Sequence, residues 1–154
     1  MSHRKVDVDF VDDEDAFVDE NQTAASATLY SAEAESAVDA RVNDARRLVS
    51  SGNMPAAVSR VLENPPAGPY PQSLKDKNTA IVLETLLAVR PNDMPAIVKS
   101  LSSTQLDTLM KYIYRGMAQP EAYNSGLLLT WHEKVTEAGG VGVIVRVLTD
   151  RKTV

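Results

Sequence analysis

The sequence predicts an all-α protein, a compact bundle of about seven short helices with α-solenoid-like helix pairs, preceded by an extended acidic N-terminal arm. From about residue 36 onward, apolar residues recur at the spacing of a helix face. Gly, Pro and Asn interrupt this spacing at short intervals, and no alternating apolar run is bounded by the hairpin turns that would indicate a sheet. We therefore expect an arm and linker over residues 1–35 and a helical domain over residues 36–154.

The arm is strongly acidic. Residues 1–22 carry eight acidic and two basic side chains, a net charge of −6, whereas the remaining 132 residues carry 14 basic and 13 acidic ones, a net charge of +1. Because like charges repel and no helical period is present, we expect residues 1–30 to be extended or disordered when free. Apolar anchors between the charges favour a strand-like peptide that docks on another protein, although a tail that serves only solubility stays an alternative. These anchors are Val6, Val8, Phe10, Val11, Phe17 and Val18.

A calcium-binding loop is a second explanation for clustered aspartates. Such a loop needs a glycine at its sixth position and a glutamate at its twelfth. Counted from Asp7, these positions hold Asp12 and Val18. Counted from Asp13, they hold Val18 and Ala24. Neither register fits, so no calcium site is expected here.

The first two helices of the body are defined by their ends. One is expected from about residue 36 until Gly52-Asn53 ends it, with an inner face of Val38, Val42, Ala45, Leu48 and Val49. Asn53 can cap the next helix, in whose first turn Pro55 is tolerated. That helix ends at Asn64-Pro65-Pro66, and its inner face is Val58, Val61 and Leu62.

Prolines divide the middle of the body. After a stiff loop at residues 67–72, a longer helix is expected over residues 73–89, because Pro91 breaks it. Its buried side chains are expected to be Leu74, Ile81, Val82, Leu86 and Val89. Asp93 with Pro95 then opens a short helix that runs through Leu101.

Two further helices follow. Ser103 or Thr104 starts the first, which Pro120 interrupts, and its apolar face is Leu106, Leu109, Met110, Ile113 and Met117. The second spans about residues 125–138 and directs inward Leu128, Trp131, Val135 and Ala138. The body also repeats itself, since residues 53–58 are matched by residues 93–98, 40 positions later. A repeat of helix pairs is typical of α-solenoids, although capping chemistry alone can generate the same coincidence.

The glycines at positions 139, 140 and 142 could form a phosphate loop or a junction between helices. A phosphate loop follows a strand and, in the Walker form, supplies a Lys-Ser/Thr pair. Here an amphipathic helix precedes Gly139, and no such pair follows. We therefore expect a helix junction, with Gly142 permitting close packing in the first turn of a last helix. The inner face of that helix is expected to be Val141, Ile144, Val145 and Leu148.

The composition leaves little material for catalysis. The chain has no cysteine and only two histidines, His3 and His132. His132-Glu133 resembles the start of a zincin motif, but Thr136 stands where the second histidine is required. We expect no catalytic residue, no bound metal and no cofactor, and hence no enzyme. A nearly neutral body argues against nucleic acid, and no apolar run reaches the roughly 20 residues of a membrane helix. The first residues lack the apolar segment of a signal peptide, so a cytoplasmic location is expected.

Partner-binding residues of the body are harder to select. The candidates are Tyr112, Tyr114, Trp131 and Arg151. The two tyrosines lie on different faces of one helix, so at least one is expected at the surface, where tyrosine often anchors an interface. Partial burial against a neighbouring helix is the alternative. Trp131 is expected to pack against the core or against a partner.

Several ordered segments together resemble one family. They are RKVDVD (4–9), FVDE (17–20), GNM-AA (52–57), NPP (64–66), LMKYIYRGM (109–117), WHEK (131–134) and GGVGVIVRVLTDRKTV (139–154). The chain is similar to the 16-kDa subunits, also called subunit 5, of the actin-related protein 2/3 complex. The resemblance covers nearly the whole chain and is interrupted at residues 21–36, which leaves the path of the arm open.

The resemblance implies a non-catalytic structural subunit that supports the nucleation of branched actin filaments. The body is then expected to dock on the β-propeller subunit and a scaffold subunit, while the arm tethers actin-related protein 2. The expected location is the cytoplasmic actin cytoskeleton, in cell projections or actin patches. A free-standing helical adaptor whose acidic arm binds basic proteins is the alternative. The arm residues that match are Arg4, Lys5, Val6, Asp7, Val8 and Asp9, with Phe17 and Val18 in a second anchor.

Overall fold

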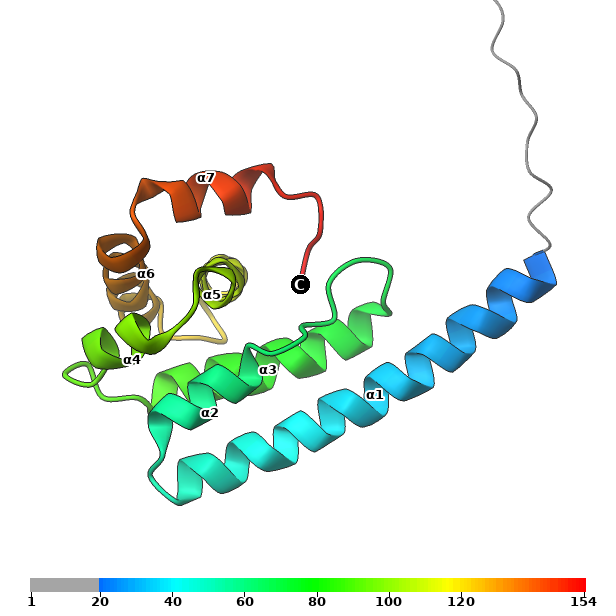
Figure 1. Cartoon of the computed structure of the whole chain (residues 1–154), viewed down its shortest axis with the longest axis horizontal. Coiled ribbons are helices and arrows are strands. Elements are labelled where there is room, and N and C mark those ends of the chain that lie inside the picture. The colour runs from blue at the N-terminus through cyan, green and yellow to red at the C-terminus, as the bar shows by residue number, and fades with distance from the viewer. Residues whose placement is uncertain (1–19) are drawn as a thin grey trace, which may run out of the picture.

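Seven helices follow one another along residues 20–154, the part of the chain whose backbone the computed structural model describes; side chains are described from residue 32 (Figure 1). They are α1 (Glu20–Ser50), α2 (Met54–Val61), α3 (Gln72–Ala88), α4 (Met94–Ser100), α5 (Ser103–Met117), α6 (Ser125–Gly139) and α7 (Val141–Thr149). No strand occurs within this range. The predicted all-α class and the predicted number of helices are confirmed.

The helices form two groups (Figure 1). α1, α2 and α3 contact one another, and α3 packs against α5. α5, α6 and α7 contact one another in turn, while the short α4 contacts α2 and α6. Every helix contributes buried side chains to one apolar core. At its centre the fully buried indole of Trp131 donates a hydrogen bond from Nε1 to the carbonyl oxygen of Leu86, 3.1 Å away.

From α2 to α6 the helix ends lie within a few residues of their predicted positions. The Asn53 side chain accepts a hydrogen bond from the Ala56 amide at 3.3 Å, and Pro55 lies in the first turn of α2. α5 begins at Ser103, as predicted, after a capping box in which Ser102 and Gln105 satisfy each other's backbone amides. Asp93 precedes α4 but makes no side-chain cap, because its carboxylate pairs with Arg90 at 3.1 Å.

α1 begins earlier than the helical period suggested. The sequence placed the start of the body at residue 36, whereas α1 begins at Glu20 and crosses the boundary expected between the arm and the body. Residues 23–36 contain five alanines and two glutamates, which favour helix even where no apolar face is present. The periodic spacing of apolar residues reveals a helix only where the helix has an apolar face, and in α1 that face begins at Val38. The division into two regions stays a prediction.

The glycine-rich junction is confirmed as a helix boundary. Gly140 ends α6 and precedes α7 with φ +69°, in the region that favours glycine. Close packing falls at Gly139 rather than at Gly142. A Cβ atom on Gly139 would lie 2.4 Å from Cγ2 of Val143, whereas one on Gly142 would meet only the end of the Arg146 side chain, at 3.0 Å.

The predicted inner face of α7 is wrong in three of its four members. Val141, Val145 and Leu148 are 67 %, 53 % and 71 % exposed, while Val143 is fully buried and Ile144 and Val147 pack against the core. α7 carries apolar residues on both of its faces, so the sequence pattern could not choose between them. Ala138, expected to point inward from α6, is exposed.

A buried polar network links the two helix groups. Arg41 of α1, only 4 % exposed, donates from Nη1 to the Asn78 side-chain oxygen of α3 and from Nη2 to the Asn64 carbonyl oxygen at 2.8 Å. Asn78 in turn donates to the Tyr112 hydroxyl of α5. Burial raises the pKa of Tyr112 to about 12, against the opposing effects of Asn78 and Arg41. The neutral phenol therefore contributes stability below its ordinary pKa of 10 that is lost as the pH rises through about 12.

We expect Gly139→Ala to lower the free energy of unfolding by about 1–3 kcal/mol, because its Cβ atom must displace Val143 in a packed core. Gly142→Ala is the matched control, since the side chain that it meets is flexible. It should change stability by no more than about 1 kcal/mol, in the stabilising direction. Urea unfolding followed by circular dichroism measures both. Equal destabilisation by the two variants would contradict the packing described here.

We expect Tyr112→Phe to destabilise the chain by roughly 1–3 kcal/mol, because the Asn78 amide then loses its buried acceptor. Tyr123→Phe serves as the control, since the Tyr123 hydroxyl makes no hydrogen bond with the described residues. Thermal and urea unfolding of both variants check this result. A Tyr112→Phe variant as stable as the wild type would show that the network contributes nothing to stability.

Candidate partner-binding site

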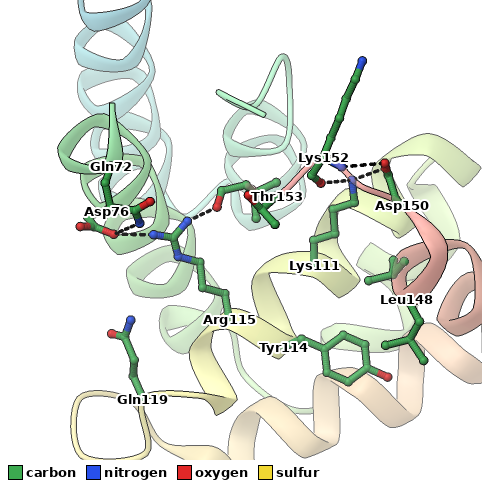
Figure 2. Close-up of a pocket in the computed structure, with 12 residues that line it drawn as sticks. Gln72, Asp76, Lys111, Tyr114, Arg115, Gln119, Leu148, Asp150, Lys152 and Thr153 are labelled. Atoms are coloured by element: carbon green, nitrogen blue, oxygen red, sulfur yellow. Dashed lines mark hydrogen bonds and ion pairs between the residues drawn. The ribbon is translucent and has the colours of Figure 1, made fainter. Parts of the chain in front are cut away.

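A surface cleft lies where the last residues of the sequence meet α3 and α5 (Figure 2). Its volume is about 550 Å³, and both polar and apolar side chains line it. α3 supplies Gln72 and Asp76, and α5 supplies Lys111, Tyr114 and Arg115. The rest of the lining is Gln119, Val147, Leu148, Asp150, Lys152, Thr153 and Val154. The cleft thus exists because an extended segment, residues 150–154, is held against two helices.

Buried hydrogen bonds hold the inner end of this segment. Lys75 is 6 % exposed and donates from Nζ to the Thr153 carbonyl oxygen at 3.1 Å and to its hydroxyl at 3.3 Å. The Gly68 amide donates to the same carbonyl at 3.3 Å, and the Val154 side chain is 5 % exposed. An ammonium group so deeply buried requires acceptors, and the segment supplies them.

Two cations of α5 hold the same segment at Asp150, Lys152 and Val154 (Figure 2). Lys111 pairs with the Asp150 carboxylate and donates to the Lys152 carbonyl oxygen at 3.0 Å. Arg115, one helical turn further on, bridges the Asp76 carboxylate of α3 and the main-chain oxygen of Val154. The Lys111 ammonium, helped by the Lys152 backbone amide, holds the pKa of Asp150 below its usual value of 3.8.

The histidine and the aromatic candidates have structural contacts. The Tyr114 hydroxyl lies 3.1 Å from Nε2 of His132, and the two rings meet edge to face. Tyr112 and Trp131 are fully buried within this chain. Among the described residues, no group of three His, Cys, Asp or Glu side chains is arranged to hold a metal ion. No described helix is both long enough and apolar enough to cross a membrane.

The predicted partner-binding residues therefore separate into three sets. Tyr114 is half-buried and lines the cleft, and Arg151 is exposed beside it. Tyr112 and Trp131 are not displayed at the surface of the described chain. The arm residues lie outside the described residues: Arg4, Lys5, Val6, Asp7, Val8, Asp9, Phe17 and Val18. Partner binding by each set stays a prediction.

Sequence reasoning missed the cations that shape the cleft. Lys75 and Arg115 bind residues about 40 to 80 positions away along the chain, and nothing local to either one reveals such a contact. One signal was available. Lys111 and Arg115 stand four residues apart and so share a helix face, which suggests that both serve one acceptor surface.

The described polar side chains thus hold helices and chain segments of this chain together, as in a protein whose role is structural. Comparisons with known proteins agree with this class. Residues 2–154 match the model of the family described as ARP2/3 complex 16 kDa subunit (p16-Arc). The chain belongs to this family.

Relatives across distant organisms support the assignment. The chain is 42 % identical to actin-related protein 2/3 complex subunit 5-C of Xenopus laevis, over 98 % of this chain and 93 % of that protein. It is 39 % identical to the human subunit 5-like protein, over 98 % and 94 %. It is 35 % identical to subunit 5 of Dictyostelium discoideum, over 90 % and 99 %. The chain is accordingly a homologue of subunit 5 of the actin-related protein 2/3 complex, which implies a non-catalytic, structural role in actin nucleation.

We expect Lys111→Met to raise the pKa of Asp150 toward 3.8, because the largest cause of its lowering is then removed. In the wild type, the lowered pKa means that this pair stabilises the fold above pH 3.8 and ceases to do so as the pH falls through the folded-state value. An NMR titration of the Asp150 carboxyl group measures its pKa in the wild type and in Lys111→Met. Arg90→Met is the control, because it removes an ion pair that joins Asp93 between α3 and α4. An unchanged Asp150 pKa in Lys111→Met would refute the claim that the Lys111 ammonium lowers it.

Proposed function

We propose that the helical body of this chain docks on the β-propeller and scaffold subunits of the actin-related protein 2/3 complex, while its N-terminal arm tethers actin-related protein 2. The observation that carries this proposal is the extent of the family match, which begins at residue 2 and so includes the arm as well as the body. The protein would act in the cytoplasm, at the branched actin cytoskeleton.

The placement of α1 supports a tether. Figure 1 shows the N-terminal turns of α1 running beyond α2 and α3, so the described chain starts away from the other helices. Nineteen residues precede Glu20, and when extended they reach about 65 Å. A subunit fixed by its body thus keeps the arm at a high effective concentration near a neighbouring subunit, and a few apolar anchors suffice to hold that neighbour.

The composition of the arm supports apolar anchoring combined with charge. Six apolar side chains alternate with eight acids over the first 20 residues. Strand-like peptides bind through main-chain hydrogen bonds and through pockets for alternate side chains. The acids would then favour a site whose rim carries basic groups, because opposite charges attract.

We expect deletion of residues 1–19 to leave the body in the complex but to weaken both retention of actin-related protein 2 and nucleation. The deletion stops before α1, so the folded part of the chain is preserved. Co-purification with the other subunits and a pyrene-actin polymerisation assay measure the two effects. Unchanged nucleation together with unchanged retention would overturn the tether.

A second arm variant separates apolar anchoring from charge. Replacing Val6, Val8, Phe10, Val11, Phe17 and Val18 by serine keeps all the acidic and basic residues of the arm. If the anchors are apolar, this variant should behave like the deletion. A variant with the acids replaced by their amides should retain more of the binding than the serine variant.

A further inference from the structure

The outer face of α7 is an apolar surface that no described residue covers. α7 contacts α5 and α6, and Figure 1 shows it along the outer edge of the body. Val143 is its fully buried side chain, with Ile144 and Val147 packed beside it. On the opposite face Val141, Val145 and Leu148 are 67 %, 53 % and 71 % exposed.

These three side chains form one stripe. Their spacing of four and three residues places them within a narrow sector of the helix, one turn above another. A helix that is hydrophobic all round is ordinarily a buried helix. Within residues 32–154, the large exposed hydrophobic side chains are these three and Leu129 of α6. The apolar exposure of the body is therefore concentrated on α7, as expected where a second protein completes the core.

The charges beyond the stripe indicate what this second protein presents. Leu148 reaches the wall of the cleft, and the exposed side chains of Arg151 and Lys152 follow it. Other cations around α7 are neutralised, since Arg146 pairs with Asp107 at 2.8 Å and Lys111 pairs with Asp150. Arg151 and Lys152 form no ion pair with any side chain of residues 32–154. They are free to pair with carboxylates of a partner.

We propose that the outer face of α7 is the surface by which the body docks on another subunit of the complex, and that this subunit presents an apolar groove with carboxylates opposite Arg151 and Lys152. The inference rests on the proposed function, because it names the part of the body that performs the docking. The apolar stripe supplies the buried contact, and the two cations set its orientation at one end.

The test compares charges placed at exposed apolar positions of α7 with a charge placed at an exposed apolar position of α6. Val145→Asp with Leu148→Asp places two charges on the stripe, and Leu129→Asp places one on α6 as the matched control. All three positions are exposed, so circular dichroism and thermal unfolding should show folded chains. The full-length variants are co-expressed with the remaining subunits. We expect incorporation of the α7 variant to fall by about tenfold or more, and that of Leu129→Asp to stay at the wild-type level.

A charge variant tests the second half of the inference. Arg151→Glu with Lys152→Glu should also reduce incorporation, more strongly at low salt than at high salt. Arg90→Glu, which alters an exposed cation between α3 and α4, should not. If the wild type enters the complex and the α7 variant enters equally well, the inference is overturned while the proposed function stands. If the wild type itself fails to enter, the proposed function is what fails.

Two other occupants would also overturn the inference. If a second copy of the chain covered the stripe, the isolated wild type would be a dimer and the isolated Val145→Asp, Leu148→Asp variant a monomer. Incorporation into the complex would be unchanged. If the chain's own arm covered the stripe, the isolated Val145→Asp, Leu148→Asp variant would be cleaved by a protease more readily than the isolated wild type. Incorporation into the complex would again be unchanged. Sedimentation and limited proteolysis of the isolated chain measure these results.

Discussion

One buried cation sets the arrangement on which the rest of the body depends. The guanidinium of Arg41 lies where water cannot reach it, and burial lowers its pKa, so neutral acceptors on other segments have to satisfy it. The Asn78 side chain and the Asn64 carbonyl accept from its two terminal nitrogens, while Nε is buried with no partner among the described residues. Asn78 in turn donates to the Tyr112 hydroxyl. A guanidinium has fixed directions for its donors, so this chain of bonds permits one relative placement of α1, α3 and α5. The Lys75 contact, one turn along α3 from Asn78, then extends the same ordering to the last residues of the sequence.

Local chemistry made most helix boundaries predictable, and long-range packing made the rest unpredictable. Asn53, Ser102, Pro91 and the glycine pair at 139–140 act within a few residues of themselves, and each boundary falls where such residues place it. The core residues of α2 and α5 were also largely predictable, because those helices carry one apolar face each. α3 is buried on more than one side, and its fully buried Leu83 was missed. α7 has two apolar faces, and the face turned inward is the one on which Val143 packs against Gly139, with Ile144 and Val147 beside it. The cleft escaped prediction because its cations and their acceptors are distant in sequence.

The structure and the family assignment meet in how the body uses its polar groups. Its described cations mostly pair with carboxylates or carbonyls of the same chain, which makes a rigid part and leaves little for chemistry. Three of the four large exposed apolar side chains within residues 32–154 lie on one helix, α7. A subunit of an assembly needs both a rigid body and an exposed apolar surface, because a rigid body can position a neighbouring protein only if it is itself attached to the assembly.

The length of α1 gives the molecule a mechanical property. Its 31 residues rise about 46 Å. The C-terminal half is seated by Arg41 and by ion pairs from Asp39 to Lys77 and from Asp44 to Arg60, while the N-terminal turns run free of the other helices (Figure 1). Such a rod is a lever with its pivot in the body. A tilt of about 10° about this seat, roughly 29 Å from Glu20, would displace the far tip by roughly 5 Å. Small shifts where the subunit is mounted thus become larger shifts where the N-terminal arm begins.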